Sequence, residues 1–501
     1  MTNTISRRGF VKRAALAGAA IGASRFTAIS YAKIAGANDK IRVGVIGFNG
    51  RGNAHIDAWR SIDGVELVAL CEADEAVLNR GYSRVMKNEP ATRPAASAPN
   101  VAAPRISKYR DVRKLLDDKE IDAISIATPN HWHSLMTVWG CQAGKDVYVE
   151  KPVSHDVWEG RQSVAAARKY SRIVQTGTQN RSNSAIAAAI DFLQKGNLGK
   201  IILGRALVYN RRGSIGKVAA TPPVPAGIDL DLWCGPSPLE APHREHFHYD
   251  WHWFWQTGNG EIGNNAIHEI DIVRWAMKNT ELSSSVISVG GRFGYVDDAQ
   301  TPNTQFAVHR FADRSLMVME IRGLPSKPNS PKQDTYKGQD VGFVIECENG
   351  YLSGAAAYDN KDKLIQNFGG KEAKNTMQQD HFANFIEAVR SRKPADLHAD
   401  IEQGHLSSAL CHTPNISYRL GKPKAPDEIA AAVKNDPAAS DALARLEEHL
   451  AINEVDVKLD MATLGMPLKM DPKTERFPDN PAANTMLKRV YRPPFVLPDE
   501  V

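Results

Sequence analysis

The sequence predicts an α/β protein with more than one domain. A run rich in β-branched residues, Ile41 to Ile46, breaks into glycines just before a helical pattern begins. A buried parallel strand that leads into a helix has this pattern. Apolar runs and helical patterns then alternate as far as Thr176. At 501 residues the chain is too long for one compact core, so we expect two domains plus extensions.

The stretch 41–55, IRVGVIGFNGRGNAH, has the pattern of a dinucleotide-binding turn. The usual motif has three glycines, and here its positions are Gly47, Asn49 and Gly52. Asparagine tolerates unusual φ angles, yet it adds bulk where a phosphate approaches the backbone. A purely structural turn is the alternative. The candidate cofactor-binding residues of the turn are Gly47, Asn49, Gly50, Arg51 and Gly52.

An acidic residue follows the turn at the distance that a ribose contact requires. Glu72 lies twenty residues after Gly52 and closes the apolar run LVALCE. A carboxylate there can accept hydrogen bonds from a ribose diol and would repel a 2′-phosphate. We therefore expect NAD rather than NADP as the cofactor. The alternative is an ordinary solvated strand end.

The N-terminus matches an export signal. SRRGFVK at residues 6–12 has the twin-arginine pattern, and an alanine-rich apolar stretch follows it. Ala35-Gly36-Ala37 is a plausible cleavage site, so residues 1–37 are predicted to be a signal peptide. The apolar stretch is too short to span a bilayer, and Arg25 interrupts it. We expect a periplasmic protein without a membrane anchor.

This signal accounts for the basic character of the chain. Residues 1–37 contain six basic residues and no acidic ones, so removing them changes the formal charge from +5 to −1. The composition therefore does not indicate nucleic-acid binding. The five cysteines show no C-x-x-C spacing and are expected to be free, buried thiols: Cys71, Cys141, Cys234, Cys347 and Cys411.

Twin-arginine export has a chemical consequence for a dinucleotide enzyme. Proteins on this route commonly cross the membrane already folded, whereas no freely exchanging NAD pool is expected outside the inner membrane. We therefore expect a cofactor that is bound tightly enough to survive export. A second half-reaction would regenerate it in place.

The rest of the first domain follows from local patterns. Alanines and prolines between Gly81 and Arg105 indicate a surface insertion. Helices are predicted at 111–118, 133–143 and 157–170, and strands at 121–128, 146–150 and 173–176.

The predicted strand 121–128 ends in the polar and aromatic cluster Pro129-Asn130-His131-Trp132-His133. Ligands bind at the carboxyl ends of parallel strands, so Thr128, Asn130 and His133 are candidate cofactor contacts. A helix cap packed by Trp132 is the alternative.

Five segments in this order resemble the Gfo/Idh/MocA family, which includes glucose-fructose oxidoreductase and inositol dehydrogenase. They are the glycine turn, TPNHWHS at 128–134, EKP at 150–152, GTQNRS at 177–182 and GNGEIGNNAIHEID at 258–271. The resemblance covers roughly residues 41–421.

The resemblance implies a fold and a domain organisation. A Rossmann NAD-binding domain would span 38–176, and an α/β domain with a large, mostly antiparallel open sheet would span 177–421. This second domain would bind substrate against the nicotinamide, and pairing through the sheet would give a homo-oligomer. Residues 422–501 form a proline-rich extension, which we expect to be an arm around one short helix at 441–450.

The resemblance also places Lys151 at the nicotinamide, in contact with the reacting hydroxyl, and puts Glu150 beside the cofactor. A free lysine holds its proton too tightly to act as a base near neutral pH. Burial and a positive nicotinamide would lower its pKa. A surface lysine at the end of a strand is the alternative.

Many family members carry Asp and His four residues apart on one helix face. His268 occupies the histidine position here, but the residue four before it is Asn264. An amide can bind a sugar hydroxyl but cannot accept its proton. Proton transfer then depends on His268, Lys151 or an acid outside this pair, with Glu261 and Asp271 as candidates. We place Asp271 with the substrate-binding residues, and local packing is its alternative.

The segment 241–255, APHREHFHYDWHWFW, combines four histidines with three tryptophans. Neutral imidazoles suit zinc or copper, but no cysteine or paired carboxylate stands at ligand spacing, so we expect no metal. Flat aromatic faces pack against sugar rings, which makes Trp251 and His252 candidate substrate contacts. Core packing of the tryptophans is a close competitor.

Three functions remain open from the sequence. The first is an NAD(P)-dependent oxidoreductase that acts on a secondary hydroxyl of a sugar or polyol with a tightly bound cofactor. The second is a redox-neutral glycosidase or lyase that acts through a transient keto-sugar. The third is a sugar-binding relative without turnover.

Overall fold

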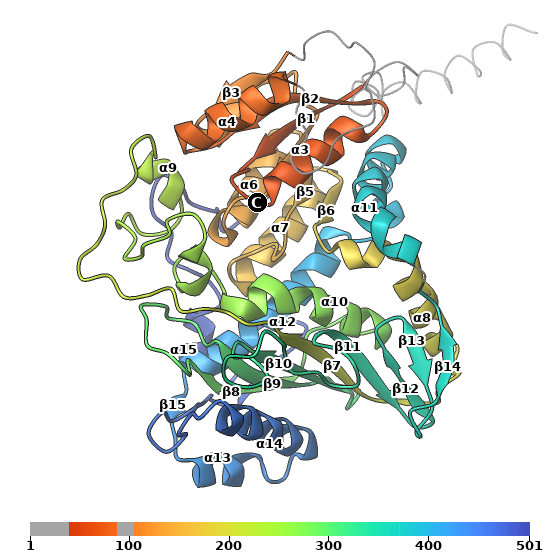
Figure 1. The fold of residues 1–501 in the computed structure, drawn as a ribbon. Helices are drawn as coiled ribbons and strands as arrows, with labels where there is room; N and C mark the ends of the chain where they lie inside the picture. The colour runs from red at the N-terminus through yellow and green to blue at the C-terminus, as the bar shows by residue number, and fades with distance from the viewer. Residues whose placement is uncertain (1–39, 88–104, 370) are drawn as a thin grey trace, which may run out of the picture.

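The computed structural model describes residues 40–87, 105–369 and 371–501. The predicted signal peptide, residues 1–37, and residues 88–104 of the predicted insertion lie outside this part of the chain. The described residues form two layered units that meet at a helical interface (Figure 1).

The first unit is a six-stranded parallel sheet in the order β3-β2-β1-β4-β5-β6. The order reverses between β1 and β4, which is where ligands bind in such sheets. Its strands are β1 (Ile41–Ile46), β2 (Val65–Cys71), β3 (Ser107–Tyr109), β4 (Ala123–Ile126), β5 (Asp146–Val149) and β6 (Val174–Thr176). The helices between them are α3 (Gly52–Ser61), α4 (Glu75–Met86), α5 (Val112–Asp117), α6 (His133–Gln142) and α7 (Val157–Lys169).

Helix α4 corrects the predicted start of the insertion. The helix continues through Gly81 to Met86, so the chain does not leave the domain at Gly81. A Cβ atom at Gly81 would lie 2.4 Å from the Phe48 ring. The glycine therefore lets α4 pack closely against the turn after β1, and it does not mark a loop.

The second unit is an eleven-stranded sheet among the described residues, antiparallel except where β7 and β10 pair. Its main strands are β7 (Ile201–Tyr209), β8 (Ser285–Gly291), β9 (Thr304–Arg310), β10 (Leu316–Arg322), β11 (Val341–Cys347), β12 (Gly350–Ser353), β13 (Ala356–Tyr358) and β14 (Leu364–Asn367). The predicted large, mostly antiparallel sheet is confirmed.

One face of this sheet faces the first domain through helices (Figure 1). These are α8 (Ser184–Gln194), α10 (Ile267–Ala276) and α12 (Ile401–Arg419), with the π-helix Ile262–Ala266 leading into α10. Helix α11 (Lys371–Ser391) instead packs on the first domain, where Phe382 and Phe385 join Trp59 and Tyr148 in its core. Short elements complete this part: α9 (Leu230–Cys234), and one-turn helices at Asn130–Trp132, Gln179–Ser182, Asp250–Trp253 and Pro394–Asp396.

The C-terminal extension is more structured than an arm around one short helix. Helices α13 (Pro426–Val433) and α14 (Pro437–Ile452) cover the other face of the large sheet, where Leu443 and Leu446 pack against Val308 and Val318. Short strands β15 (Lys422–Pro423), β16 (Thr463–Leu464) and β17 (Leu468–Lys469) extend the sheet, and α15 (Pro481–Thr485) follows. The prediction of a single helix was therefore wrong.

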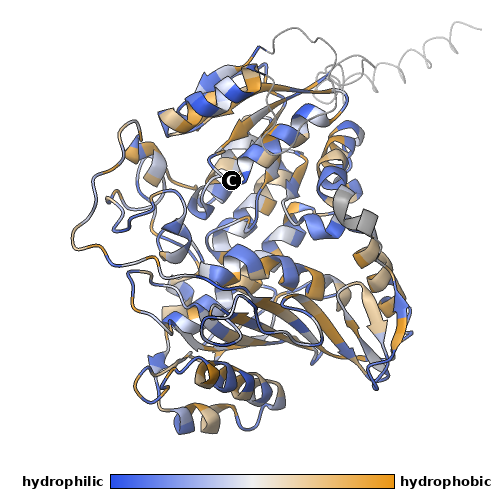
Figure 2. Ribbon diagram, in the orientation of Figure 1, coloured by the Kyte–Doolittle hydropathy of each residue, from blue (hydrophilic) through white to orange (hydrophobic). Residues whose placement is uncertain are grey.

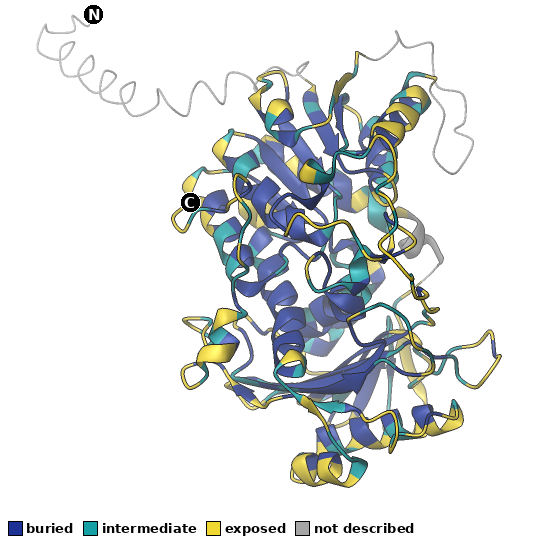
Figure 3. Ribbon diagram, turned by 90° about the vertical axis from the view of Figure 1, so that its left-hand side faces the viewer, coloured by how far each residue is buried: buried dark blue, intermediate teal, exposed yellow. Residues whose placement is uncertain are grey.

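The central strands of both sheets are buried, and exposed residues concentrate on the edge strands β3, β14 and β15 and on outer helices and loops (Figure 3). Helices α4 and α14 are amphipathic and carry both hydrophilic and hydrophobic residues, as helices that cover a sheet do (Figure 2). Across the described ranges, no helix has both the length and the apolar character needed to cross a bilayer.

Candidate functional site

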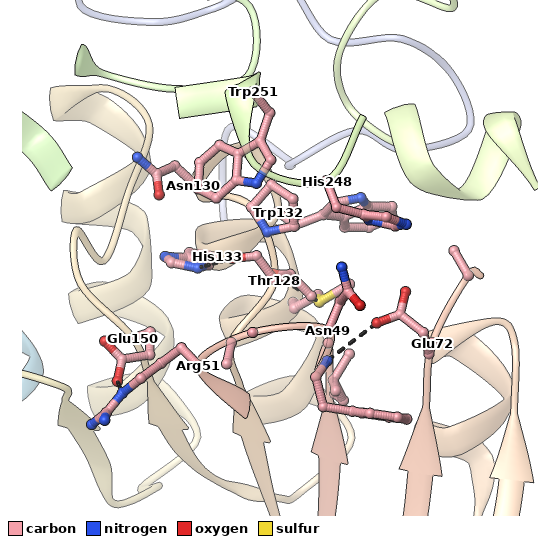
Figure 4. Close-up of a pocket in the computed structure, with 18 of the residues that line it drawn as sticks. Asn49, Arg51, Glu72, Thr128, Asn130, Trp132, His133, Glu150, His248 and Trp251 are labelled. Carbon is pink, nitrogen blue, oxygen red and sulfur yellow. Dashed lines mark hydrogen bonds and ion pairs between the residues drawn. The ribbon is translucent and has the colours of Figure 1, made fainter. Parts of the chain in front are cut away.

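A cleft of about 460 Å³ lies at the carboxyl ends of the first sheet, against the second domain. Figure 4 shows Glu150 and Glu72 toward opposite ends of the cleft, Asn49 between them, and His248 and Trp251 across from the glycine turn. Its walls come from the turn after β1, the ends of β2, β4 and β5, the segment 248–252 and the π-helix.

The glycine turn has the close contacts that a dinucleotide cradle requires. Gly47 has φ +75°, and a Cβ atom on it would lie 2.8 Å from Thr128. A Cβ atom on Gly52 would lie 2.0 Å from the Gly47 carbonyl oxygen, whereas one on Gly50 would meet nothing within 4 Å. Helix α3 begins here without a side-chain cap, and the positive end of its dipole favours a pyrophosphate at this place. These residues fit bound NAD.

Asn49, which replaces the middle glycine, lines the cleft between Glu150 and Glu72 (Figure 4). Its side chain is exposed, and its Oδ1 accepts a hydrogen bond from Arg80 Nη2 on α4 at 3.2 Å. This hydrogen bond ties the Asn49 amide to α4, on the side of the cleft nearer Glu72.

Glu72 sits at the end of β2 with its carboxylate turned back toward the turn. It accepts hydrogen bonds from the Phe48 N–H at 3.2 Å and the Asp74 N–H at 3.3 Å (Figure 4). Burial raises the pKa of the Glu72 carboxyl, and these two bonds oppose the rise. The carboxylate lines the cleft at the place where a ribose diol would lie in a Rossmann fold.

The end of β4 supplies Thr128, Asn130 and His133 to the cleft, as predicted from the sequence pattern. The His133 ring nitrogens lie 2.6 Å from the Pro152 carbonyl oxygen and 2.8 Å from the Thr128 carbonyl oxygen. This ring therefore ties the β4 end to the segment after β5. Trp132 both lines the cleft and packs against Phe495, so the packing alternative also holds.

Glu150 is the charged centre of the inner end of the cleft. Its Oε1 accepts hydrogen bonds from Arg51 Nε at 2.8 Å, His55 Nε2 at 3.0 Å and Gln179 Nε2 at 3.1 Å. Burial alone would raise the pKa of this carboxyl, but Arg51 and His55 hold it well below its usual range. His55 in turn contacts Ser125 Oγ at 2.8 Å, which completes a buried chain of polar groups behind Glu150.

No role for His55 or Gln179 follows from the sequence pattern, although both residues lie inside motifs that carry the family resemblance. His55 ends the glycine-turn stretch, and Gln179 lies in GTQNRS. Only the folded chain shows that both converge on Glu150, because 124 residues separate them along the sequence.

Lys151 is half-buried in the cleft beside Glu150, and its peptide bond to Pro152 is cis. Its Nζ donates a hydrogen bond to the Asn264 backbone carbonyl at 2.5 Å. Burial lowers the pKa of this amine, and the nearby Arg51 charge lowers it further, while Glu150 opposes the fall. The structure therefore places Lys151 in the cleft, and desolvation lowers its pKa as the resemblance implies.

His268 and Asn264 line the same cleft from α10 and the π-helix. The His268 Nδ1 atom is buried and has no hydrogen-bond partner among the described residues. Burial, reinforced by the Lys151 charge, lowers the pKa of His268 to about 3, so the ring is neutral at physiological pH. The Asn264 amide donates to Glu261 at 3.3 Å. Lys151, Asn264 and His268 thus meet in one place.

The two acids near this group are both engaged elsewhere. Glu261 is 2% exposed and forms a two-point ion pair with Arg212 at 2.8 and 3.0 Å. Asp271 is fully buried, does not line the cleft, and binds Arg181 through both oxygens at 2.7 and 2.9 Å. Its assignment to substrate binding was therefore wrong, because its carboxylate is used to neutralise a buried arginine.

The aromatic segment covers the cleft from the second domain. The Trp251 and His252 rings stack with centroids 3.6 Å apart, and both residues line the cleft as predicted. His252 Nδ1 donates to the Tyr249 carbonyl at 2.6 Å, which leaves Nε2 as an acceptor in the neutral ring. His248, which also lines the cleft, bonds Asp74 at 2.8 Å.

The remaining histidines and the thiols do not add a reactive centre. His243 and His246 lie outside the cleft wall. No group of three or more metal-ligating side chains occurs in ranges 40–87, 105–369 and 371–501. All five cysteines are buried and free, as predicted, and burial raises the pKa of the Cys71 thiol well above its usual value.

Comparison with known proteins agrees with this architecture. Residues 41–178 match the model described as the oxidoreductase family, NAD-binding Rossmann fold. Residues 203–328 match the oxidoreductase family, C-terminal alpha/beta domain.

Curated relatives match this chain at low sequence identity and over part of its length. A glycosyl hydrolase family 109 protein of Shewanella baltica strain OS185 is 28% identical over 223 residues, which cover 41% of this chain and 46% of that protein. The chain thus spans about half the length of the curated relatives it matches.

Solved structures share the fold. The WlbA dehydrogenase of Bordetella pertussis, solved with NADH and UDP-GlcNAcA, has a TM-score of 0.53 at 18% identity over 74% of this chain and 94% of that one. Levoglucosan dehydrogenase with NADH has a TM-score of 0.52 at 17% identity, with 74% and 95% covered. Together with the two matching domain models, this likeness leads to one conclusion: the chain belongs to the Gfo/Idh/MocA family of oxidoreductases with an NAD-binding Rossmann fold.

Proposed function

We propose that this protein oxidises a secondary hydroxyl of a sugar or polyol with a tightly bound NAD. The observation that carries the proposal is the meeting of Lys151 and His268 in the cleft that the glycine turn opens. Glu72 at the ribose end supports NAD over NADP, since its carboxylate would repel a 2′-phosphate.

The residues of the cleft have different proposed roles according to their positions. The glycine turn and the uncapped start of α3 would hold the pyrophosphate, and Glu72 would hold the ribose. Bound NAD would supply the hydride acceptor. Lys151 in its neutral form takes the hydroxyl proton, and burial favours that form. The neutral His268 ring accepts or returns a proton beside it, while Asn264 can bind a substrate hydroxyl without taking its proton.

A second candidate is a redox-neutral glycosidase. A ketone formed by the first step acidifies the neighbouring C–H, and loss of that proton expels the glycosidic oxygen. Water then adds, and reversal of the first step restores the hydroxyl. Two observations favour this cycle: the name of the family 109 relatives, and the absence, among the described residues, of an unpaired carboxylate beside Lys151. It consumes no external NAD.

One experiment separates the candidates. The purified mature protein is incubated with an aryl glycoside and no added cofactor, and then with a panel of sugars and polyols. Release of the aglycone selects the glycosidase. A bound NADH absorbance that persists until a ketose or aldose acceptor is added selects the oxidoreductase. Neither signal with any substrate would leave a sugar-binding protein without turnover.

The cellular location and the oligomeric state are further proposals from the sequence. Export through the twin-arginine route is supported by SRRGFVK at residues 6–12. Replacing Arg7 and Arg8 with lysine should abolish the periplasmic fraction, and unchanged export would contradict this address. A homo-oligomer rests on resemblance alone, and light scattering of the purified protein tests it.

A further inference from the structure

A second cavity, of about 330 Å³, lies where the C-terminal extension meets the rest of the molecule. It shares no lining residue with the cofactor cleft. Its walls come from the segment after EKP, the segment before the π-helix, the end of α12 and the C-terminal tail. The lining residues used below are His155, Trp255, Asn259, Asn415, Arg419 and Arg489.

Two arginines place positive charge on this cavity. The Arg419 guanidinium lies over the Trp255 ring, 5.0 Å from its centre. Arg419 is exposed, and no carboxylate in the described part of the chain forms an ion pair with it. Arg489 donates through Nη2 to Ser237 and to the Gln256 carbonyl, but its Nε and Nη1 are buried without a partner among the described residues.

Two acids, Asp156 and Glu159, lie near enough to Arg489 to feel its charge, but they are hydrogen-bonded to other groups. Asp156 accepts hydrogen bonds from the Glu159 N–H and the Arg489 backbone N–H, both at 2.9 Å. Glu159 accepts from the Tyr491 hydroxyl at 2.8 Å. Burial raises the pKa of both carboxyls, and for Asp156 the charge of Glu159 adds to the rise, while the Arg489 charge opposes the rise at both. Neither carboxylate forms an ion pair with either guanidinium in the described structure.

Further polar atoms on the same walls lack partners. His155 Nε2 and Asn415 Oδ1 are buried and unbonded among the described residues. Burial lowers the pKa of His155 well below its usual value, so its ring is neutral and adds no charge. Buried polar groups in folded proteins almost always have a partner. An oxyanion can satisfy the free Arg489 N–H groups, whereas Asn415 Oδ1 is an acceptor that requires a donor such as water.

We propose that this cavity binds a small oxyanion: a carboxylate, a phosphate or a sulfate. Two guanidinium groups without an ion-pair partner favour an anion over a neutral sugar and exclude a cation. The Arg419 and Arg489 side chains come from α12 and the tail, so an anion between them would also fasten the extension to the second domain.

The cavity wall is joined directly to the cofactor cleft. Asn259 Oδ1 accepts a hydrogen bond from Asn130 Nδ2, which lines the cleft, at 3.0 Å. Asn259 Nδ2 donates to the His155 carbonyl at 3.0 Å, and the Asn259 carbonyl accepts from Asn415 at 2.9 Å. One asparagine thus contacts residues of both cavities.

Thermal unfolding of the full chain tests the proposal. Sulfate, phosphate, acetate and glucuronate are titrated separately at constant ionic strength, with sodium chloride as balance. We expect a saturable rise in Tm of about 3 °C for at least one of them. The order of the four anions by Tm shift shows whether the cavity prefers a carboxylate, a phosphate or a sulfate.

Variants locate the effect. Arg419→Gln and Arg489→Gln should each remove the saturable rise, whereas Arg476→Gln, an exposed arginine of the same extension, should keep it. A shift that does not saturate, or that is equal in all variants, would mean that the cavity holds water only. If either variant fails to fold, equilibrium dialysis of the wild type with radiolabelled sulfate or phosphate decides, and less than about 0.1 anion per chain overturns the proposal. Neither measurement uses turnover, so its outcome is independent of the proposed function.

Discussion

Lys151 is the residue on which the proposed chemistry depends, because its amine lies in the cleft with a pKa that desolvation lowers. Replacing it with alanine should reduce kcat by about 10²–10⁴-fold, the usual contribution of a positioned acid or base. The dinucleotide content should not change. Lys200→Ala, at an exposed lysine, is the control. Unchanged turnover would remove Lys151 from the mechanism.

The pH dependence of turnover follows from the same residue. Below the lowered pKa of Lys151 the amine is protonated and cannot accept the hydroxyl proton, so kcat/KM should rise with pH toward that pKa. His268, with a pKa of about 3, stays neutral above pH 5 and should add no inflection near 6.5. An inflection of kcat/KM near pH 6.5 that is lost in His268→Gln would contradict the neutral state of His268.

Arg80 is a positioning residue for the unusual glycine turn. If its hydrogen bond keeps the Asn49 side chain off the phosphate path, Arg80→Ala should weaken NAD binding about tenfold, equivalent to 1.4 kcal/mol. Adding Asn49→Gly to this variant should restore affinity, while Asn49→Gly alone should have little effect. Calorimetry on cofactor-stripped protein measures the NAD affinity of the wild type, the two single variants and the double variant. Weak binding that persists in the double variant would mean that Arg80 contacts the cofactor itself.

At the scale of elements, α10 depends on a buried ion pair. Asp271 neutralises Arg181 and also accepts from Ser407 at 2.7 Å. Asp271→Asn would leave the arginine buried without a counter-charge, so the free energy of unfolding should fall by about 3 kcal/mol. KM of the folded fraction should not change. A large rise in KM without a loss of stability would return Asp271 to the substrate site.

The elements that the sequence predicts well are those whose signals are local. Strand β1, the glycine turn and the alternation to β6 depend on apolar runs and glycines, and the structure places them as expected. Helix α4 was missed because Gly81 has the pattern of a turn, although it serves close packing on Phe48. Local pattern cannot separate these two uses of glycine.

The site shows the same limit. The cleft brings together Lys151, Asn264 and His268, which separate motifs had indicated. Asp271 was misassigned because its partner Arg181 lies 90 residues away in sequence. The strands β15 to β17 were likewise unpredictable, since two-residue strands carry almost no periodicity and pair only in the folded sheet.

At the scale of the whole molecule, the C-terminal extension joins the two domains. Helix α14 packs on the large sheet, whereas Phe495, Leu497 and Val501 pack in the core of the first domain. Arg492 of the tail bonds the Gly235 and Ser237 carbonyls, near the aromatic segment that covers the cleft. The tail thus links the first domain to the segment that lines the cleft, which suits the tightly bound cofactor that we propose.

Retention of the dinucleotide is therefore the central claim. The most direct test is to purify the mature protein without added nucleotide, denature it, and identify and quantify the released dinucleotide by mass spectrometry. We predict about one NAD or NADH per chain. Release of NADP instead, or of no dinucleotide at all, would contradict the account.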